Sequence, residues 1–495
     1  DPATLRITDN SSTSGDGTGN EVTRGWLENR AANANITLEA DGLITIDKMA
    51  SNLINLKTGT GNNFTLRSLK SDGIVFADAN TEIRTQGGSI NLEALGVGST
   101  LSNIGKLTSN GGDISLVSNS GITLGNALNA GSGNITVQSV AASIGSLSDN
   151  AVLSGAKVSL LAATGNLGNA TTALNTATSA LVLQTGGHLN VANDGSLDSL
   201  SITSRHVLPN ATNTYALSSD GLEFSMDDGN SYDLQRVVQD GLDFTFSGDR
   251  NVRLGTLDLG NGDLQLTSTN GSLLAGSDNL LRAASLRLSA TGAIGANGQA
   301  LNTESPSIQA TALNGGLYLN NAGDLALSAL ATGRVDIATS GTLLLKSLSA
   351  TNQAVSLNAS AGDITTDSGI ILDAGSLGLT ATGAIGSAGN RLLSNATGFT
   401  ANAGLGGVYA DLKGSSATLD VISGNGAIDL TTAGNTNAVR LISSTSSPAN
   451  GIKLEVAKGY LNLGDIDSGN LADVLLRLLG SGAVNSNYNT RVSGR

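Results

Sequence analysis

Two stretches that repeat each other decide the fold of this 495-residue chain. They are Leu264 to Gly295, LQLTSTNGSLLAGSDNLLRAASLRLSATGAIG, and Val355 to Gly386, VSLNASAGDITTDSGIILDAGSLGLTATGAIG. They align without a gap, and the shared hexapeptide ATGAIG begins at Ala290 and again at Ala381, an offset of 91 residues (381 − 290). Residues 163–204 give a third, looser copy. Such an internal period is the mark of a repeat array.

A shorter period runs inside the long one. Apolar pairs separated by one residue recur every 20 to 27 residues, beginning at Leu264, Leu286, Ile308, Val335, Val355 and Leu377. Within each interval, apolar clusters alternate with Gly, Asn, Asp, Ser and Thr, which predicts three short strands joined by turns. Helical repeats would need apolar residues at i, i+3, i+4 and i+7, and these units lack that pattern. The sequence therefore predicts an all-β, right-handed parallel β-helix solenoid of about 22 coils.

Composition agrees with a chain that turns often. It has 65 Gly and 4 Pro, and only 3% of its residues are aromatic and 13% charged. The formal charge of −14 argues against nucleic acid and anionic lipid as partners. The absence of Cys excludes disulfides and thiolate metal sites. No apolar run approaches the roughly 18 residues of a membrane span, so no membrane insertion is expected. The start, DPATLRITDN, is expected to belong to a processed or excised piece of a longer protein.

The chain divides into five segments. They are an N-terminal cap or irregular start (1–35), β-helix coils (36–204), an extra-helical insert (205–253), further coils (254–470) and a terminal coil, cap or truncation point (471–495). VTRGWLENR, from Val22 to Arg30, is expected to form a short helix in which Trp26 covers the first coil; a ligand platform is the alternative. LADVLLRLLG, from Leu471 to Gly480, could be a short helix or a strand buried on both sides.

The insert is unlike the rest of the chain. Residues 205–253 hold twelve charged residues and five of the twelve Phe and Tyr. Asp-Gly pairs at Asp220, Asp228 and Asp240 separate the alternating runs LEFSM, YDLQRVV and LDFTF. Asp-Gly between such runs is a strong hairpin pattern. We expect a small antiparallel meander that stands off the solenoid.

Insertions in repeat arrays often carry binding sites. The ligand-binding candidates in the insert are Tyr215, Phe224, Asp227, Asp228, Tyr232 and Phe244. The alternative is a structural patch whose aromatic rings pack on the flank of a coil.

Local motifs for chemistry are not found. The two histidines, His188 and His206, have no neighbouring Cys or His, so the sequence predicts no metal site and no nucleophile with its base. DDGNSYD, from Asp227 to Asp233, lacks the ligand spacing of a Ca²⁺ loop. We therefore expect no catalytic residues and no cofactor.

Several phrases of the sequence resemble one family. NITLEADGLITI (from Asn35), TEIRTQGGSINLEA (Thr81 to Ala94) and GGDISLVSNSGITLG (Gly111 to Gly125) are similar to the haemagglutinin-type repeats of filamentous-haemagglutinin-like exoproteins, which are exported by two-partner secretion. The resemblance implies a secreted or cell-surface bacterial fibre with an outer-membrane secretion partner. It implies an adhesin or biofilm-matrix scaffold, and not an enzyme, that contacts host surfaces, other cells or exopolysaccharide.

Two further possibilities stay open. Parallel β-helices also serve as polysaccharide-degrading lyases or hydrolases, which need paired carboxylates and sugar-stacking aromatics along one groove. Exposed strand edges at the ends of a coil stack could also lead to end-to-end or lateral self-association.

Overall fold

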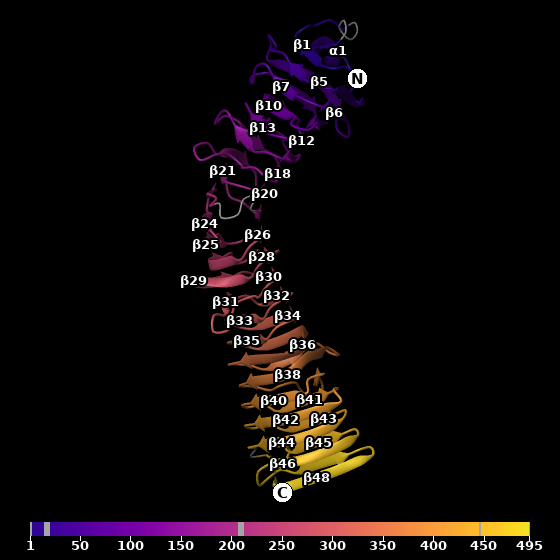
Figure 1. The fold of residues 1–495 in the computed structure, drawn as a ribbon, viewed down its shortest axis with the longest axis vertical. Coiled ribbons are helices and arrows are strands. Elements are labelled where there is room, and N and C mark those ends of the chain that lie inside the picture. The colour runs from indigo at the N-terminus through magenta and orange to yellow at the C-terminus, as the bar shows by residue number, and fades with distance from the viewer. Residues whose placement is uncertain (1, 14–19, 206–211, 445–446, 495) are drawn as a thin grey trace. The chain divides into compact units, whose positions relative to one another are not determined.

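The computed structural model describes residues 2–13, 20–205, 212–444 and 447–494. The protein is nearly all β, with 59% strand and 1% helix, and it forms a parallel β-solenoid of about 19 turns (Figure 1). The fold class predicted from the sequence is thus confirmed, but the predicted count of about 22 coils is too high.

The chain consists of two compact units, unit 1 (Asp1–Asp249) and unit 2 (Arg250–Arg495). Unit 1 arranges its strands in three parallel rows. The first row is β2 (Glu21–Thr23), β1 (Leu5–Thr8), β4 (Ile44–Ile46), β7 (Gly73–Phe76), β10 (Thr100–Ile104), β13 (Ile122–Leu124) and β16 (Ile144–Ser146). The second row is β5 (Leu53–Gly59), β8 (Glu82–Gln86), β11 (Lys106–Thr108), β14 (Leu128–Asn129), β17 (Val152–Ser154), β19 (Leu174–Ala177), β21 (Leu189–Asn193) and β23 (Tyr215–Ser218). The third row is β3 (Ile36–Ala40), β6 (Asn63–Ser68), β9 (Ser89–Ala94), β12 (Ile114–Ser118), β15 (Ile135–Ser139), β18 (Lys157–Ala162), β20 (Ala180–Thr185), β22 (Ser199–Ser204) and β26 (Asp243–Gly248).

The core forms because alternate residues point inward and equivalent residues stack. One buried column of the third row is Ile36, Phe64, Ile90, Ile114, Ile135, Val158, Leu181, Leu200 and Phe244. Each large apolar side chain removed from water stabilises the fold by about 1.5–3 kcal/mol. Since each coil contacts mainly its neighbours, stability accumulates along the array.

Buried hydroxyl groups close the corners of the coils. Ser118 Oγ donates to the carbonyl oxygens of Ser99 (3.0 Å) and Gly121 (3.3 Å). Ser423 Oγ does the same in unit 2, with 2.8 Å to the carbonyl oxygen of Gly426. A buried carbonyl oxygen without a hydrogen-bond donor is costly. An inward Ser hydroxyl supplies that donor to the carbonyl three residues later, at the corner.

The short helix predicted near the start of the chain is present. The expected short helix is α1 (Arg24–Glu28), and the Thr23 side chain caps it by accepting from the Trp26 amide at 3.2 Å. Leu27 is fully buried, whereas Trp26 is half-exposed and its ring lies 4.2 Å from the Arg30 guanidinium carbon. Leu27 is thus the fully buried side chain of α1, and Trp26 is half-buried beside Arg30; that Trp26 covers the first coil stays a prediction.

The insert is smaller than predicted. β24 (Glu223–Asp228) and β25 (Tyr232–Val238) form the expected antiparallel hairpin. The third run, LDFTF, lies in β26, which pairs parallel with β22 as a coil strand. The three-stranded meander is therefore wrong, because Phe244 and Phe246 point into the core next to Leu200 and Ile202.

Unit 2 has two main rows of strands. Row A is β28 (Asp263–Ser268), β30 (Ser285–Ala290), β32 (Ser307–Ala312), β34 (Leu325–Ala331), the start of β36 (Leu343–Ala359), β37 (Ile364–Thr366), β41 (Val408–Leu412), β43 (Ile428–Thr432), β45 (Ile452–Val456) and β47 (Val474–Leu478). Row B is β27 (Val252–Asp258), β29 (Leu273–Arg282), β33 (Leu317–Asn321), β35 (Val335–Thr339), the end of β36, β38 (Ile371–Ala381), β40 (Gly398–Ala403), β42 (Ser416–Ser423), β44 (Asn435–Ser443), β46 (Gly459–Asp467) and β48 (Gly482–Ser493). The short strands β31 (Leu301–Glu304) and β39 (Leu392–Ser394) lie beside these rows.

The two copies of the 91-residue repeat contribute to opposite rows. Four successive pairings between neighbouring coils lead along row B from Val252 to Val335. Leu343, which lies 91 residues after Val252, comes next in the chain but belongs to row A. The repeat is thus about four and a half coils long. Consequently Leu264 lies in row A, whereas its equivalent Val355 pairs with Val335 in row B. Figure 1 shows the labels β32 and β34 on one side of unit 2 and β33 and β35 on the other.

The Leu-rich segment near the end of the chain is a coil strand. It forms β47, which pairs parallel with β45. Both sequence alternatives, a short helix and a strand buried on both sides, are wrong, because Leu475 and Arg477 point outward and Leu475 is 46% exposed.

Candidate binding surfaces

The predicted binding residues of the insert are mostly buried. Tyr215, Asp228, Tyr232 and Phe244 expose at most 8% of their surface. Phe224 is half-buried, and only Asp227 is exposed. The structure thus brings the aromatic residues together beneath the hairpin, which favours the structural alternative over a ligand platform.

Hydrogen bonds hold the tyrosines of the insert in place. Tyr215 Oη lies 2.6 Å from Ser204 Oγ, and Tyr232 Oη donates to Asp249 Oδ1 at 2.7 Å. The Tyr232 ring meets Phe246 edge to face, with ring centroids 5.4 Å apart. Burial raises the pKa of both phenols well above the ordinary value. These tyrosines are therefore neutral hydrogen-bonding parts of the core.

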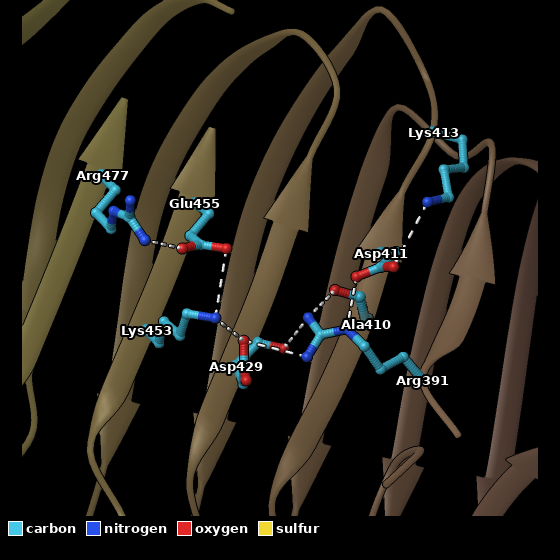
Figure 2. Close-up of polar contacts among 8 residues, drawn as sticks. All are labelled: Arg391, Ala410, Asp411, Lys413, Asp429, Lys453, Glu455 and Arg477. Carbon is cyan, nitrogen blue, oxygen red and sulfur yellow. Dashed lines mark hydrogen bonds and ion pairs between the residues drawn. The ribbon is translucent and has the colours of Figure 1, made fainter. Parts of the chain in front are cut away.

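A second candidate surface is a set of alternating charges on row A of unit 2, the charged ladder (Figure 2). Its members are Arg391, Asp411, Lys413, Asp429, Lys453, Glu455 and Arg477. Arg391 is the centre, with Nε 2.6 Å from Asp411 Oδ1 and an Nη atom 3.1 Å from Asp429 Oδ1. It also donates to the carbonyl oxygens of Ala410 (3.0 Å) and Asp429 (2.8 Å). Arg391 therefore links three successive coils.

The register of row A explains the charged ladder. Tyr409, Asp429 and Lys453 pair in sequence along β41, β43 and β45. Two residues further along the same strands, the position of Asp411 leads through paired positions to Glu455 and then to Arg477. Side chains along a strand point inward and outward in turn, and both sets lie at outward positions. Charges about 20 residues apart in sequence therefore lie next to each other on the surface.

A shallow depression of about 390 Å³ opens beside the charged ladder. Tyr409, Asp429, Lys453, Pro448, Asp473 and Leu475 are among the residues that line it. Aromatic, apolar and charged groups thus lie side by side around this open depression.

Row B and unit 1 carry similar arrangements. Arg440 binds Asp420 with two hydrogen bonds of 2.7 and 3.0 Å. In unit 1, Arg67 lies between Glu39 (2.6 Å) and Glu93 (2.5 Å) of the adjacent coils. Ion pairs between coils are therefore a general device of this solenoid.

The pKa of Glu82 shows that such contacts outweigh burial. Burial acts to raise this pKa, but hydrogen bonds from Arg84 and Thr108 and the charge of Lys106 lower it below the ordinary value. Glu82 is thus held as a carboxylate and is unsuited to act as a general acid near neutral pH.

Within the described ranges, no group of three His, Cys, Asp or Glu side chains is placed to hold a metal ion. His188 Nδ1 accepts a hydrogen bond from the Thr214 amide at 2.9 Å, so it joins two segments of unit 1. His206 lies outside the described residues. No helix in the described part of the chain is both long and apolar enough to cross a bilayer.

Comparisons of the chain with protein-family models, with curated proteins and with solved structures find no match.

The charged ladder was missed in the sequence analysis, although its pattern was present. Asp411, Asp429 and Lys453 each follow an inward apolar residue at the spacing of one coil. Finding the ladder required the register of each coil, and the coil lengths vary because the corner loops vary.

Proposed function

We propose that this chain is part of a bacterial extracellular adhesin or biofilm-matrix fibre, whose solenoid units present polar surfaces to cells, host surfaces or exopolysaccharide. The observation that carries the proposal is the in-register stacking of outward polar side chains along both units. A surface built by repetition offers the same contact many times, and many weak contacts add up to strong attachment. The resemblance of the repeats to filamentous-haemagglutinin-like exoproteins supports export through an outer-membrane partner.

Adhesion of the purified chain tests the proposal. The full chain is coupled to fluorescent beads and incubated with bacterial biofilms, with host-cell monolayers and with immobilised exopolysaccharide. We expect saturable retention on at least one of these surfaces and competition by free chain. Equal retention of beads that carry an unrelated protein of the same net charge would contradict the proposal.

The same preparation separates a scaffold from an enzyme. Each polysaccharide is incubated with the chain and analysed for new reducing ends and for unsaturated sugars. Release of either product would favour the alternative, a polysaccharide lyase or hydrolase. Sedimentation over a range of concentrations tests the proposed self-association, which predicts species larger than the monomer.

A further inference from the structure

Two tyrosines occupy equivalent places in the 91-residue repeat. Tyr318 and Tyr409 differ by 91 positions (409 − 318), and both are half-exposed. Each follows, one coil later, the final glycine of ATGAIG, Gly295 or Gly386, at a φ of 68° or 67°. The repeat has therefore placed one aromatic ring in the same local setting twice.

Each ring lies close to a glycine two residues earlier in the chain. A Cβ atom built on Gly316 would be 2.7 Å from Cε2 of Tyr318, and one built on Gly407 would be 2.7 Å from Cε2 of Tyr409. The ring thus takes the space that a side chain would otherwise fill, as aromatic residues do over glycines in sheets. The glycine leaves room for the ring, and each tyrosine stays half-buried, so part of its side chain is accessible to a ligand.

An aspartate and an arginine accompany each tyrosine. Asp336 pairs in register with Tyr318, and Arg334 lies 3.0 Å from its carboxylate. Asp429 pairs in register with Tyr409, and Arg391 lies 3.1 Å from its carboxylate. We call these groups platform 1 (Tyr318, Asp336, Arg334) and platform 2 (Tyr409, Asp429, Arg391).

The arginines come from different places in the chain. Arg334 is two residues before Asp336, whereas Arg391 precedes β39. The 91-residue repeat accounts for the two tyrosines but not for the two arginines. The same three groups are therefore brought together in two different ways.

The chemistry of a platform fits one sugar ring. A flat aromatic surface packs against the apolar C–H face of a sugar, a carboxylate accepts hydrogen bonds from adjacent hydroxyls, and a guanidinium donates to ring or hydroxyl oxygens. Because the carboxylate and the guanidinium neutralise each other, a platform favours an uncharged glycan over a polyanion. At platform 2 the depression of about 390 Å³ adds Lys453 and Pro448 around the ring.

We propose that each platform binds a sugar unit of a neutral polysaccharide and that unit 2 thereby bridges two polysaccharide strands. Platform 1 lies in row B and platform 2 in row A, because the repeat is about four and a half coils long. One strand lying along one row would reach only one platform, so two platforms in different rows join two strands. This inference rests on the proposed matrix function and names its ligand class.

Bead aggregation tests whether the chain bridges two polysaccharide strands, whereas bead binding tests only attachment. Beads coated with mannan, β-glucan or galactan are mixed with the full chain, and both bead binding and bead aggregation are recorded. We expect the wild-type chain to bind and aggregate beads that carry at least one of these neutral polymers. Tyr318→Ala and Tyr409→Ala should each keep binding, weakened about 10-fold or more by the loss of avidity, and should lose aggregation. The double variant should lose both.

Tyr460→Ala is the matched control, since Tyr460 is 55% exposed in the same unit and belongs to neither platform. It should bind and aggregate beads as the wild type does, and circular dichroism confirms that every variant is folded. Aggregation by either single platform variant, or no binding of wild type to any of the three polymers, would overturn the inference. Loss of binding to protein-coated beads in the double variant would assign the platforms to a protein partner instead.

The adhesin proposal is judged separately. If the double variant still adheres to cells or biofilms as the wild type does, the platforms are not the contact surface and the adhesin proposal stands. If the wild type adheres to none of these surfaces, both proposals fail.

Discussion

The aromatic side chains of the insert and those of the repeat have opposite roles. Near the hairpin, Tyr232, Phe244 and Phe246 are fully buried, whereas Tyr318 and Tyr409 of the repeat lie half-exposed over glycines. The difference teaches that a local excess of aromatic residues marks a place where the solenoid must fill its core. Aromatic residues that recur at the period of the repeat mark a surface instead.

The interruption of the winding explains the need for large rings. Between β22 and β26, which pair directly, the chain leaves the third row to build the hairpin. The buried column of the third row then continues with Phe244 after Leu200. Phe246 likewise follows Ile202, so rings fill the core where the chain returns from the hairpin and keep the packing dense.

The largest expected effect is the removal of a buried ring. Tyr232→Ala should destabilise unit 1 by about 3–5 kcal/mol, because it leaves a cavity and removes a hydrogen-bond donor from Asp249. Tyr318→Ala, the half-exposed counterpart, should cost less than about 1 kcal/mol. Hydrogen exchange of the amides of β22 and β26 measures the first effect, and that of β33 measures the second. Similar losses in both variants would break the comparison.

Alkaline pH should destabilise the region that holds the two buried tyrosines. The pKa of Tyr215 and of Tyr232 is raised by burial, so both keep their protons in the folded state when the unfolded chain loses them near pH 10. Their contribution is fully present below pH 10, and stability should fall above it by about 1.4 kcal/mol per pH unit for each tyrosine. Urea unfolding of the chain at pH 9, 10 and 11 measures the slope.

A matched variant identifies the source of that slope. Tyr215→Phe keeps the buried ring and removes its titration, so it should reduce the loss of stability above pH 10 by about half. An unchanged slope in Tyr215→Phe would place the alkaline effect elsewhere.

The extent to which the sequence predicts this structure follows from the same comparison. The apolar alternation of runs such as Leu264 to Leu266 fixes the coil strands, because each strand needs only its own inward residues. The hairpin follows from the Asp-Gly pair at Asp228 and its flanking alternation. The role of Phe244 could not be predicted, because the same alternation suits a hairpin strand and a coil strand, and only the pairing with β22 distinguishes them.

The platforms and the charged ladder depend on register, which the sequence determines only coil by coil. Tyr318 and Tyr409 are equivalent in sequence, yet they lie in different rows because the repeat is about four and a half coils long. The partners of Arg391 come from the next two coils, across corner loops of unequal length. A residue count along the repeat therefore predicts the local setting of a tyrosine but not the row that it occupies.

A smaller loss of stability is expected when the arginine of platform 2 is removed. Arg391→Ala should lower the stability of unit 2 by about 1 kcal/mol, since its guanidinium is only 21% exposed and contacts Asp411 and Asp429. The loss should shrink in high salt, because screening weakens the ion pairs that the wild type has. Arg477→Ala is the control: this side chain is 53% exposed with Glu455 as its partner in the charged ladder, and its removal should change stability by less than about 0.5 kcal/mol. Urea unfolding at 0.05 and 1 M NaCl distinguishes the two variants.

The smallest expected effect tests what the platform ring contributes. Tyr409→Phe keeps the flat ring over Gly407 and removes only the hydroxyl, so stability should change by less than about 0.5 kcal/mol. If stacking is the main contact with the sugar, the variant should also keep its binding to polysaccharide-coated beads within about twofold, whereas Tyr409→Ala loses bead aggregation. Loss of aggregation in Tyr409→Phe would show that the hydroxyl, and not the ring face, makes the decisive contact. The surface tyrosine would then act through a hydrogen bond, as the buried Tyr232 does, and the contrast between the two regions would be reduced to burial alone.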